Sequence, residues 1–162
     1  MDPDEATRLD VTQLHGPIGD DGIPRGDLEA VRRLARTYAL GVDRRDETLV
    51  QSLFTDDAVV AGSLGQSSAR EYVPRLIAGA SEYAATQHNI TNQYVARAPD
   101  DPEALVVISY AVAIHLGADD DGTGDLTMGV EYRDRARRST HGWLISHRNT
   151  VALWRRSGAA TP

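Results

Sequence analysis

Four long segments with β-strand character fill the second half of the chain, and this run constrains the fold more than any other feature. The segments cover residues 88–98, 105–117, 125–137 and 142–156. Short clusters of Asp, Pro, Gly, Ser and Thr lie between them, and these are the residues that form tight turns. We therefore expect four long strands connected as a meander.

Helical patterns precede this run of strands. Asp27 is expected to cap a helix whose apolar residues recur every three or four positions as far as Val42. The pattern then predicts, in order, a shorter helix, a short strand, a loop and a third helix, over residues 46–54, 58–61, 63–68 and about 72–80. Helices followed by strands predict an α+β domain in which the helices pack on one face of an antiparallel sheet.

Length and composition indicate one domain with two terminal extensions. A chain of 162 residues suits a single domain that buries about two-thirds of its unfolded surface. Residues 1–26 are rich in Gly, Pro and Asp, a composition that disfavours helices and buries little apolar surface. We expect an irregular or disordered arm over residues 1–26, the domain over 27–157 and a tail over 158–162.

Charge and composition exclude several classes of function. The net charge of −7 argues against a nucleic-acid partner, because phosphate contacts need clustered Lys and Arg. Absence of cysteine excludes disulfides and thiolate chemistry. No apolar run approaches the roughly 20 residues of a membrane span, and the acidic start lacks secretory-signal features, so we expect a cytoplasmic protein without a membrane partner. We interpret one basic cluster as a solvated strand end: Arg133, Arg135, Arg137 and Arg138.

Side-chain alternation suggests a cavity on one face of the sheet. In the segment 105–117, one face carries large apolar residues and the other carries small residues ending in His115. Small side chains leave room either for a cavity or for a closely packed helix. The next segment places four residues on one face that would form an apolar wall: Leu126, Met128, Val130 and Tyr132.

His88 and His115 are the first candidates for acid/base chemistry, because both lie in strand segments among apolar or small neighbours. Histidine titrates near neutral pH, and a carboxylate that accepts its Nδ1–H would fix the tautomer and raise its basicity. Asp43, at the end of the first helix, is the candidate carboxylate. Spacing alone favours a structural alternative in which Asp43 caps the next helical turn and His88 is a core histidine. We set aside His15, His141 and His147, which lie in the arm, in a turn and on the face opposite Arg148.

Several motifs resemble the SnoaL-like branch of the NTF2-like superfamily. The stretch from Tyr38 through Asp43 to Ala58, with Leu-Phe-Thr-Asp-Asp-Ala at its end, is similar to the branch's opening helix and turn. Thr-Gln-His-Asn-Ile around His88 resembles its strand-opening histidine, and Gly-Trp-Leu-Ile-Ser-His-Arg-Asn from Gly142 resembles its closing strand. The resemblance covers residues 27–154 and implies a cone in which helices pack on a curved antiparallel sheet around a central pocket.

The resemblance also implies a site. Scytalone dehydratase, bile-acid 7α-dehydratase and hexachlorocyclohexane dehydrochlorinase, which are eliminating enzymes of this branch, share an Asp/His dyad that carries over to Asp43 and His88. Tyr38 and Arg148 match further positions of these enzymes and are the expected donors. The alternative for Arg148 is a structural ion pair with Asp43. His115 matches a second histidine of scytalone dehydratase. The branch implies chemistry without a cofactor or metal, so we do not expect an Asp43–His88–His115 metal site.

The expected function is elimination or isomerisation of a small, mostly apolar cyclic substrate, by a dehydratase, isomerase or related enzyme of secondary metabolism or of steroid or aromatic degradation. Alternatives on the same scaffold are a polyketide cyclase, an epoxide hydrolase that activates water with Asp43, and a non-catalytic binding module. The branch also suggests a homo-oligomer, a trimer rather than a dimer. We expect five residues to contact the substrate: Phe54, Tyr110, His115, Met128 and Tyr132.

Overall fold

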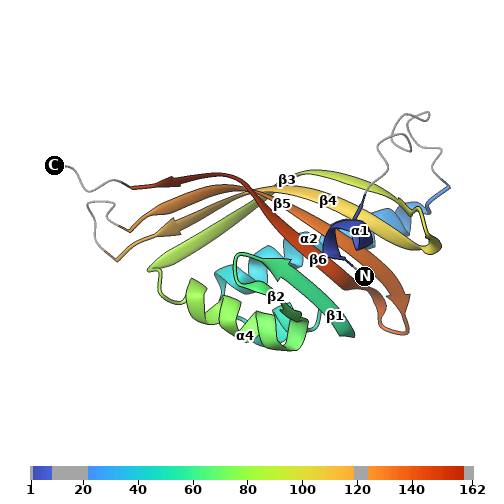
Figure 1. Ribbon diagram of the computed structural model, residues 1–162, viewed down its shortest axis with the longest axis horizontal. Coiled ribbons are helices and arrows are strands. Elements are labelled where there is room, and N and C mark those ends of the chain that lie inside the picture. Colours follow the sequence, from blue (N-terminus) through green and yellow to red (C-terminus); the bar gives the residue numbers. More distant parts are fainter. Residues whose placement is uncertain (1, 9–21, 119–123, 159–162) are drawn as a thin grey trace.

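The structure, a computed structural model, describes residues 2–8, 22–118 and 124–158. Within these ranges, helices pack on a curved sheet that does not close (Figure 1). The helices are α1 (Pro3–Ala6), α2 (Arg25–Asp43), α3 (Glu47–Gln51) and α4 (Ala69–Ala80). The strands are β1 (Phe54–Gly62), β2 (Gly65–Ser68), β3 (Ala85–Ala98), β4 (Asp101–Leu116), β5 (Leu126–Ser139) and β6 (Gly142–Ser157).

The sheet has the strand order β2-β1-β6-β5-β4-β3. Strands β3 to β6 form the expected antiparallel meander. The first two strands differ from expectation, because β1 extends over nine residues and a hairpin strand, β2, replaces the expected loop. Strand β1 also pairs in parallel with β6, so the sheet is mixed rather than wholly antiparallel.

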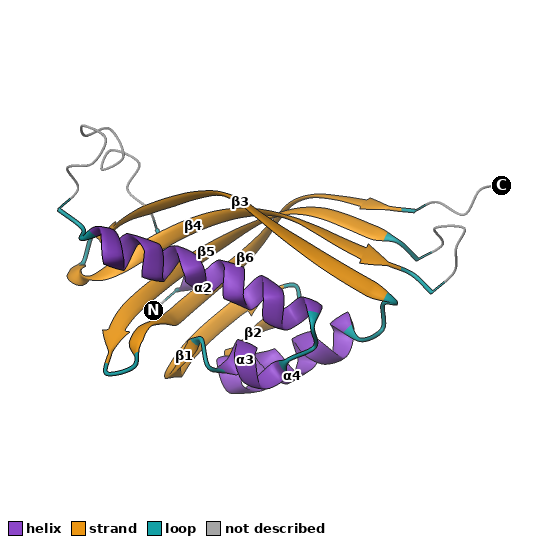
Figure 2. Ribbon diagram, turned by 180° about the vertical axis from the view of Figure 1, so that it is seen from behind, coloured by secondary structure: helices purple, strands orange, loops and turns teal. Residues whose placement is uncertain are grey.

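Helix α2 crosses one face of the sheet (Figure 2). Its buried residues recur every three or four positions, as expected of an amphipathic helix packed on a core. The helix begins at Arg25 after Pro24, so Asp27 lies in its first turn and is not its cap. The Asp27 carboxylate instead accepts a hydrogen bond from Trp143 Nε1 on β6 at 2.9 Å.

Helices α3 and α4 lie together beside one end of α2 (Figure 2). The backbone N–H of Leu49 donates to the Asp46 carboxylate, which caps α3. The Ser68 hydroxyl accepts from the N–H of Glu71 and caps α4. Asp46, rather than Asp43, is therefore the capping carboxylate, which leaves Asp43 available for other contacts.

Helix α1 lies on the sheet face opposite α2 (Figure 1). Part of the expected irregular arm is therefore helical, and residues 9–21 of that arm, with His15, lie outside the described residues. The interpretation of the arginine cluster was wrong for Arg135, whose side chain is only 3% exposed. Its Nη1 donates to the carboxylate of Asp100 at 2.7 Å and to the carbonyl of Ala6.

No helix in the described ranges is long and apolar enough to cross a membrane.

Candidate active site

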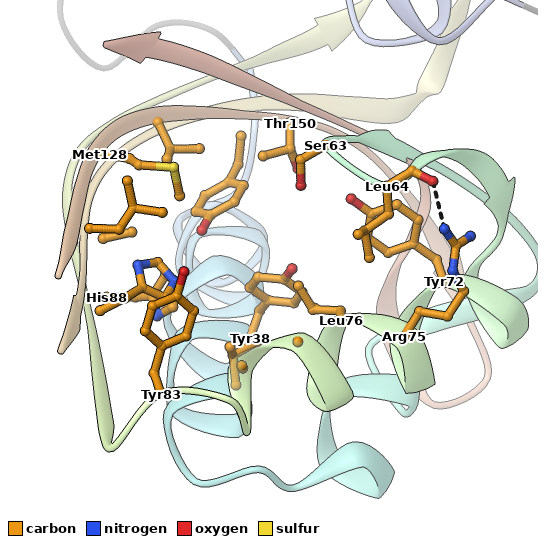
Figure 3. Close-up of a pocket in the computed structure, with 18 of the residues that line it drawn as sticks. Tyr38, Ser63, Leu64, Tyr72, Arg75, Leu76, Tyr83, His88, Met128 and Thr150 are labelled. Atoms are coloured by element: carbon orange, nitrogen blue, oxygen red, sulfur yellow. Dashed lines mark hydrogen bonds between the residues drawn. The ribbon is translucent and has the colours of Figure 1, made fainter. Parts of the chain in front are cut away.

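A cavity of about 200 Å³ opens between α2, α4 and the concave face of the sheet (Figure 3). The small face of β4 serves both expected purposes. Ala113 and His115 line the cavity, whereas Ser109 is buried and linked through Gln93 to the backbone of α2. The wall is mostly apolar and aromatic. Its residues are Tyr38, Val42, Ser63, Leu64, Tyr72, Arg75, Leu76, Gly79, Ala80, Tyr83, His88, Ala113, His115, Leu126, Met128, Val130, Tyr132, Thr150 and Arg155.

Asp43 and His88 meet beside this cavity. The helix end places Asp43 against the start of β3, where its Oδ1 lies 2.6 Å from Nδ1 of His88. The backbone N–H of His88 donates to the other carboxylate oxygen at 2.9 Å. The His88 side chain is only 7% exposed and lines the cavity (Figure 3). Because the Asp43 carboxylate contacts Nδ1, the other ring nitrogen of His88, Nε2, is available to contact a ligand.

Two further residues orient Asp43. The Thr86 hydroxyl donates to Oδ1 of Asp43 at 3.0 Å and accepts from Nη1 of Arg45 at 2.6 Å. Arg45 has a φ of 58°, an uncommon backbone conformation for a residue with a side chain. This conformation turns the guanidinium back onto the end of α2, where it donates to the carbonyls of Val42 and Asp43. The result is a continuous chain of hydrogen bonds from Arg45 through Thr86 and Asp43 to His88.

Replacing Thr86 by valine should lower the free energy of unfolding by about 1 kcal/mol, because Asp43 loses a donor and Arg45 loses an acceptor in a half-buried position. Urea denaturation followed by circular dichroism measures the change. Thr91→Val is the matched control, since the Thr91 hydroxyl donates only to the exposed carbonyl of Tyr110. Equal losses in the two variants would contradict the structural role of Thr86.

His115 lies next to His88, with ring centroids 5.4 Å apart and nearly perpendicular planes. The ring of Tyr83, in the turn between α4 and β3, has its centroid 4.8 Å from that of His115. Nδ1 of His115 is buried and has no hydrogen-bond partner among the described residues. Burial, together with the neighbouring His88, lowers the pKa of His115 from its usual 6.5.

This depressed pKa makes the stability contribution of His115 depend on pH. Above about 6.5 the imidazole is neutral in both folded and unfolded chains; as the pH falls from there through the lower folded pKa, protonation favours the unfolded chain. We expect the melting temperature to fall less between pH 7.5 and 5.5 in His115→Gln than in the wild type. His141→Gln, at an exposed turn position, should retain the wild-type slope. Parallel slopes in all three proteins would contradict the assignment.

The phenol of Tyr38 lines the cavity, and burial raises its pKa to about 12 against the opposing effect of the Arg148 cation. Burial also raises the pKa of Tyr132, which packs edge-to-face on Tyr38 at 5.6 Å. Both phenols are therefore protonated at neutral pH and act as hydrogen-bond donors.

Arg148 does not line the cavity. Its guanidinium lies 4.0 Å from the centroid of the Tyr38 ring, is fully buried and pairs with Asp134 through two hydrogen bonds of 2.6 Å. The alternative in which Arg148 pairs with Asp43 is therefore wrong, because Asp134 stands directly opposite it on β5. Arg148 therefore acts on the cavity through the rings of Tyr38 and Tyr132, which both line it and lie 4.0 and 4.8 Å from the guanidinium.

The structure divides the expected substrate contacts. His115, Met128 and Tyr132 line the cavity. Phe54 does not line it and packs behind it against Tyr38, at 6.4 Å between ring centroids. Tyr110 was wrongly included, because successive side chains of β4 alternate and Tyr110 stands on the sheet face opposite His115.

Several wall and supporting residues were missed by the sequence analysis. Tyr83 lies in the turn after α4, Arg75 on the surface of α4 and Arg155 near the end of β6, where no local pattern marks a side chain as facing a cavity. Thr86 was quoted only as part of the histidine motif, and its hydrogen bond with Asp43 follows from the register of β3 against the end of α2.

Among the described residues, no three or more His, Asp or Glu side chains gather as ligands for a metal ion.

Comparison with solved structures shows the same fold in proteins of distant sequence. A protein from Novosphingobium aromaticivorans, provisionally named an aromatic ring hydroxylase, is 21% identical and has a TM-score of 0.74, with 83% of this chain and 95% of that chain covered. A second protein from that species, provisionally named a scytalone dehydratase, is 17% identical with a TM-score of 0.71 over 84% and 90% of the two chains. A hexachlorocyclohexane dehydrochlorinase from Novosphingobium barchaimii is 19% identical with a TM-score of 0.70 over 84% and 92%. These likenesses show the fold.

No curated protein matches the chain by sequence. The model of the SnoaL-like domain family, in contrast, matches residues 26–149, which is most of the chain and nearly all of the described helices and strands. The match includes the end of α2, the start of β3 and most of the cavity wall. Family model and fold agree, and the chain therefore belongs to the SnoaL-like family of the NTF2-like superfamily.

Proposed function

We propose that this protein is a cofactor-independent acid/base enzyme that eliminates a leaving group from, or isomerises, a small and mostly apolar cyclic substrate. The observation that carries the proposal is the 2.6 Å contact between Asp43 Oδ1 and His88 Nδ1 at the wall of the cavity. A carboxylate on Nδ1 directs the other ring nitrogen toward proton transfer and stabilises the imidazolium that results. Dehydratase and dehydrochlorinase names among the structural neighbours fit this chemistry.

In the proposed reaction, neutral His88 removes a proton from a carbon next to a carbonyl. The C–H electron pair forms a carbon–carbon double bond as the leaving group departs from the adjacent carbon with its own electron pair. In an isomerisation the proton instead returns to a different carbon of the resulting enolate. Asp43 stabilises the imidazolium in either case, and a base of this kind contributes about 10²–10⁴-fold to the rate.

Tyr38 is the proposed donor to the departing or enolate oxygen. Its raised pKa of about 12 keeps the phenol protonated, so it can give a hydrogen bond or a proton. Loss of that proton would create a phenolate beside the Arg148 cation, whose charge opposes the rise in the Tyr38 pKa. Arg148 is thus a positioning residue that acts through Tyr38.

Cavity size and lining support the substrate class. A volume of about 200 Å³ lies below the roughly 300–1,000 Å³ of pockets that enclose drug-sized ligands. One ring with few substituents suits this space better than a fused polycyclic skeleton. Leu76, Met128 and Val130 supply apolar surface, and the tyrosines supply hydrogen bonds.

The contacts of Asp43 favour elimination or isomerisation over epoxide hydrolysis. Its two oxygens accept hydrogen bonds from the Thr86 hydroxyl and the His88 backbone, as well as contacting Nδ1 of His88. Asp43 does not line the cavity, so a water in the cavity is closer to His88 than to this carboxylate.

A proton-exchange assay tests the proposal without knowledge of the natural substrate. A panel of small cyclic ketones and β-hydroxy ketones is incubated with the protein in D₂O, and NMR follows exchange of the protons next to the carbonyl and formation of the enone. The expected result is enzyme-dependent exchange of at least one ketone. Exchange no faster than in the His88→Gln variant across the whole panel would favour a non-catalytic binding module.

A further inference from the structure

The cavity wall carries positive charge in a protein whose net charge is −7. Arg75 of α4 and Arg155 of β6 both line it, and no Asp or Glu of the described residues does. The nearby carboxylate of Asp43 sits behind His88, and that of Asp134 is paired with Arg148. The cavity therefore has two arginines at its wall without a wall carboxylate to balance them.

Arg75 lies across the cavity from His88 (Figure 3). Its Nη2 donates to the carbonyl of Leu64 at 3.0 Å, which holds the guanidinium beside the wall. A guanidinium has five N–H donors, so most remain for a ligand. No carboxylate of the described chain pairs with Arg75.

Arg155 approaches from the sheet. It stands opposite Met128 in the antiparallel pairing of β5 and β6, and directly opposed residues share a face, so Arg155 extends on the cavity side. Arg156, the next residue, stands opposite Thr127 and belongs to the other face. Within the described ranges, Arg155 forms no ion pair.

We propose that the substrate carries a carboxylate on its small apolar ring, and that Arg75 and Arg155 bind this group while His88 faces the carbon that loses a proton. The inference rests on the proposed function and names the substrate class more closely. Guanidinium groups match the planar geometry of a carboxylate. A cavity with low-dielectric walls and charge of one sign also concentrates ligands of the opposite sign.

The test compares two probes that differ in one charge, 4-oxocyclohexane-1-carboxylate and its neutral amide. Isothermal titration calorimetry at pH 8 and low salt gives both dissociation constants. We expect the wild type to bind the carboxylate about tenfold more tightly than the amide, with about threefold from each exposed arginine. Arg75→Gln/Arg155→Gln should bring the ratio close to one, and each single variant should lower it by about threefold. Arg156→Gln, which like each single variant removes one positive charge but on the other face, should retain the wild-type ratio.

Three results would overturn the inference: no binding of the carboxylate, equal affinity for the two probes in the wild type, or a preference that survives in the double variant. Circular dichroism confirms that the variants, which change exposed side chains, remain folded. The outcome is separable from that of the proposed function. A carboxylate preference without proton exchange would reject the enzyme alone, and proton exchange without the preference would reject this inference alone.

Discussion

Replacing His88 by glutamine should lower the rate of proton exchange from a ketone substrate by about 10²–10⁴-fold. Glutamine is close to histidine in size and still offers a polar group to Asp43, but it cannot take up a proton at neutral pH. The loss should appear in kcat rather than in KM, because the base acts on the substrate already bound. NMR exchange rates in D₂O at saturating ketone measure it directly.

Two variants make the His88 result specific. Asp43→Asn should keep the shape of the site while removing the charge that stabilises the imidazolium, so it should also lose activity with little change in KM. His141→Gln removes an exposed histidine away from the cavity and should be fully active. If His88→Gln keeps more than a tenth of the wild-type rate, another group is the base and the proposed mechanism is wrong.

The strands of the meander were predictable because their signals are local. Alternation within each segment and turn residues between them predicted three of the four strands to within three residues at both ends. The fourth, β4, begins four residues earlier than expected. The β2 strand has no such signal, since Gly65 to Ser68 are small and polar and become a strand only by pairing with β1. The parallel pairing of β1 with β6 joins segments far apart in sequence, and no local pattern reports it.

The candidate site was predictable where the resemblance reached it. The motifs pointed to Asp43 and His88, and the structure shows the contact between them. Their catalytic roles stay predictions, as do the homotrimer and the cytoplasmic location. Arg148 was expected to act as a donor because it matches an arginine in the last strand of the enzymes that the chain resembles. In the structure, the guanidinium instead donates two hydrogen bonds to the carboxylate of Asp134 on the neighbouring strand. The error for Tyr110 was avoidable, because the alternation of side chains along the strand already placed Tyr110 and His115 on opposite faces of the sheet.

Asp134→Ala should lower the free energy of unfolding by about 3–5 kcal/mol. Asp134 and Arg148 are nearly inaccessible to solvent and are joined by two hydrogen bonds of 2.6 Å. Removal of the carboxylate leaves the Arg148 cation buried against the aromatic rings of Tyr38, Tyr132 and Phe54, without an anionic partner. Such a loss is a large fraction of the roughly 5–15 kcal/mol that stabilises a typical domain, and urea denaturation measures it.

Two comparisons separate the buried charge from the loss of a side chain. Arg137→Ala breaks the exposed pair with Asp57 and should cost no more than about 1 kcal/mol. Asp134→Leu/Arg148→Met removes both charges and should recover much of the stability lost in Asp134→Ala, since well-packed apolar residues often replace a buried ion pair without loss. That double variant also leaves Tyr38 without its cation. If Arg148 acts through Tyr38, the double variant should be stable yet slow in proton exchange, whereas a purely structural Arg148 would leave the rate unchanged.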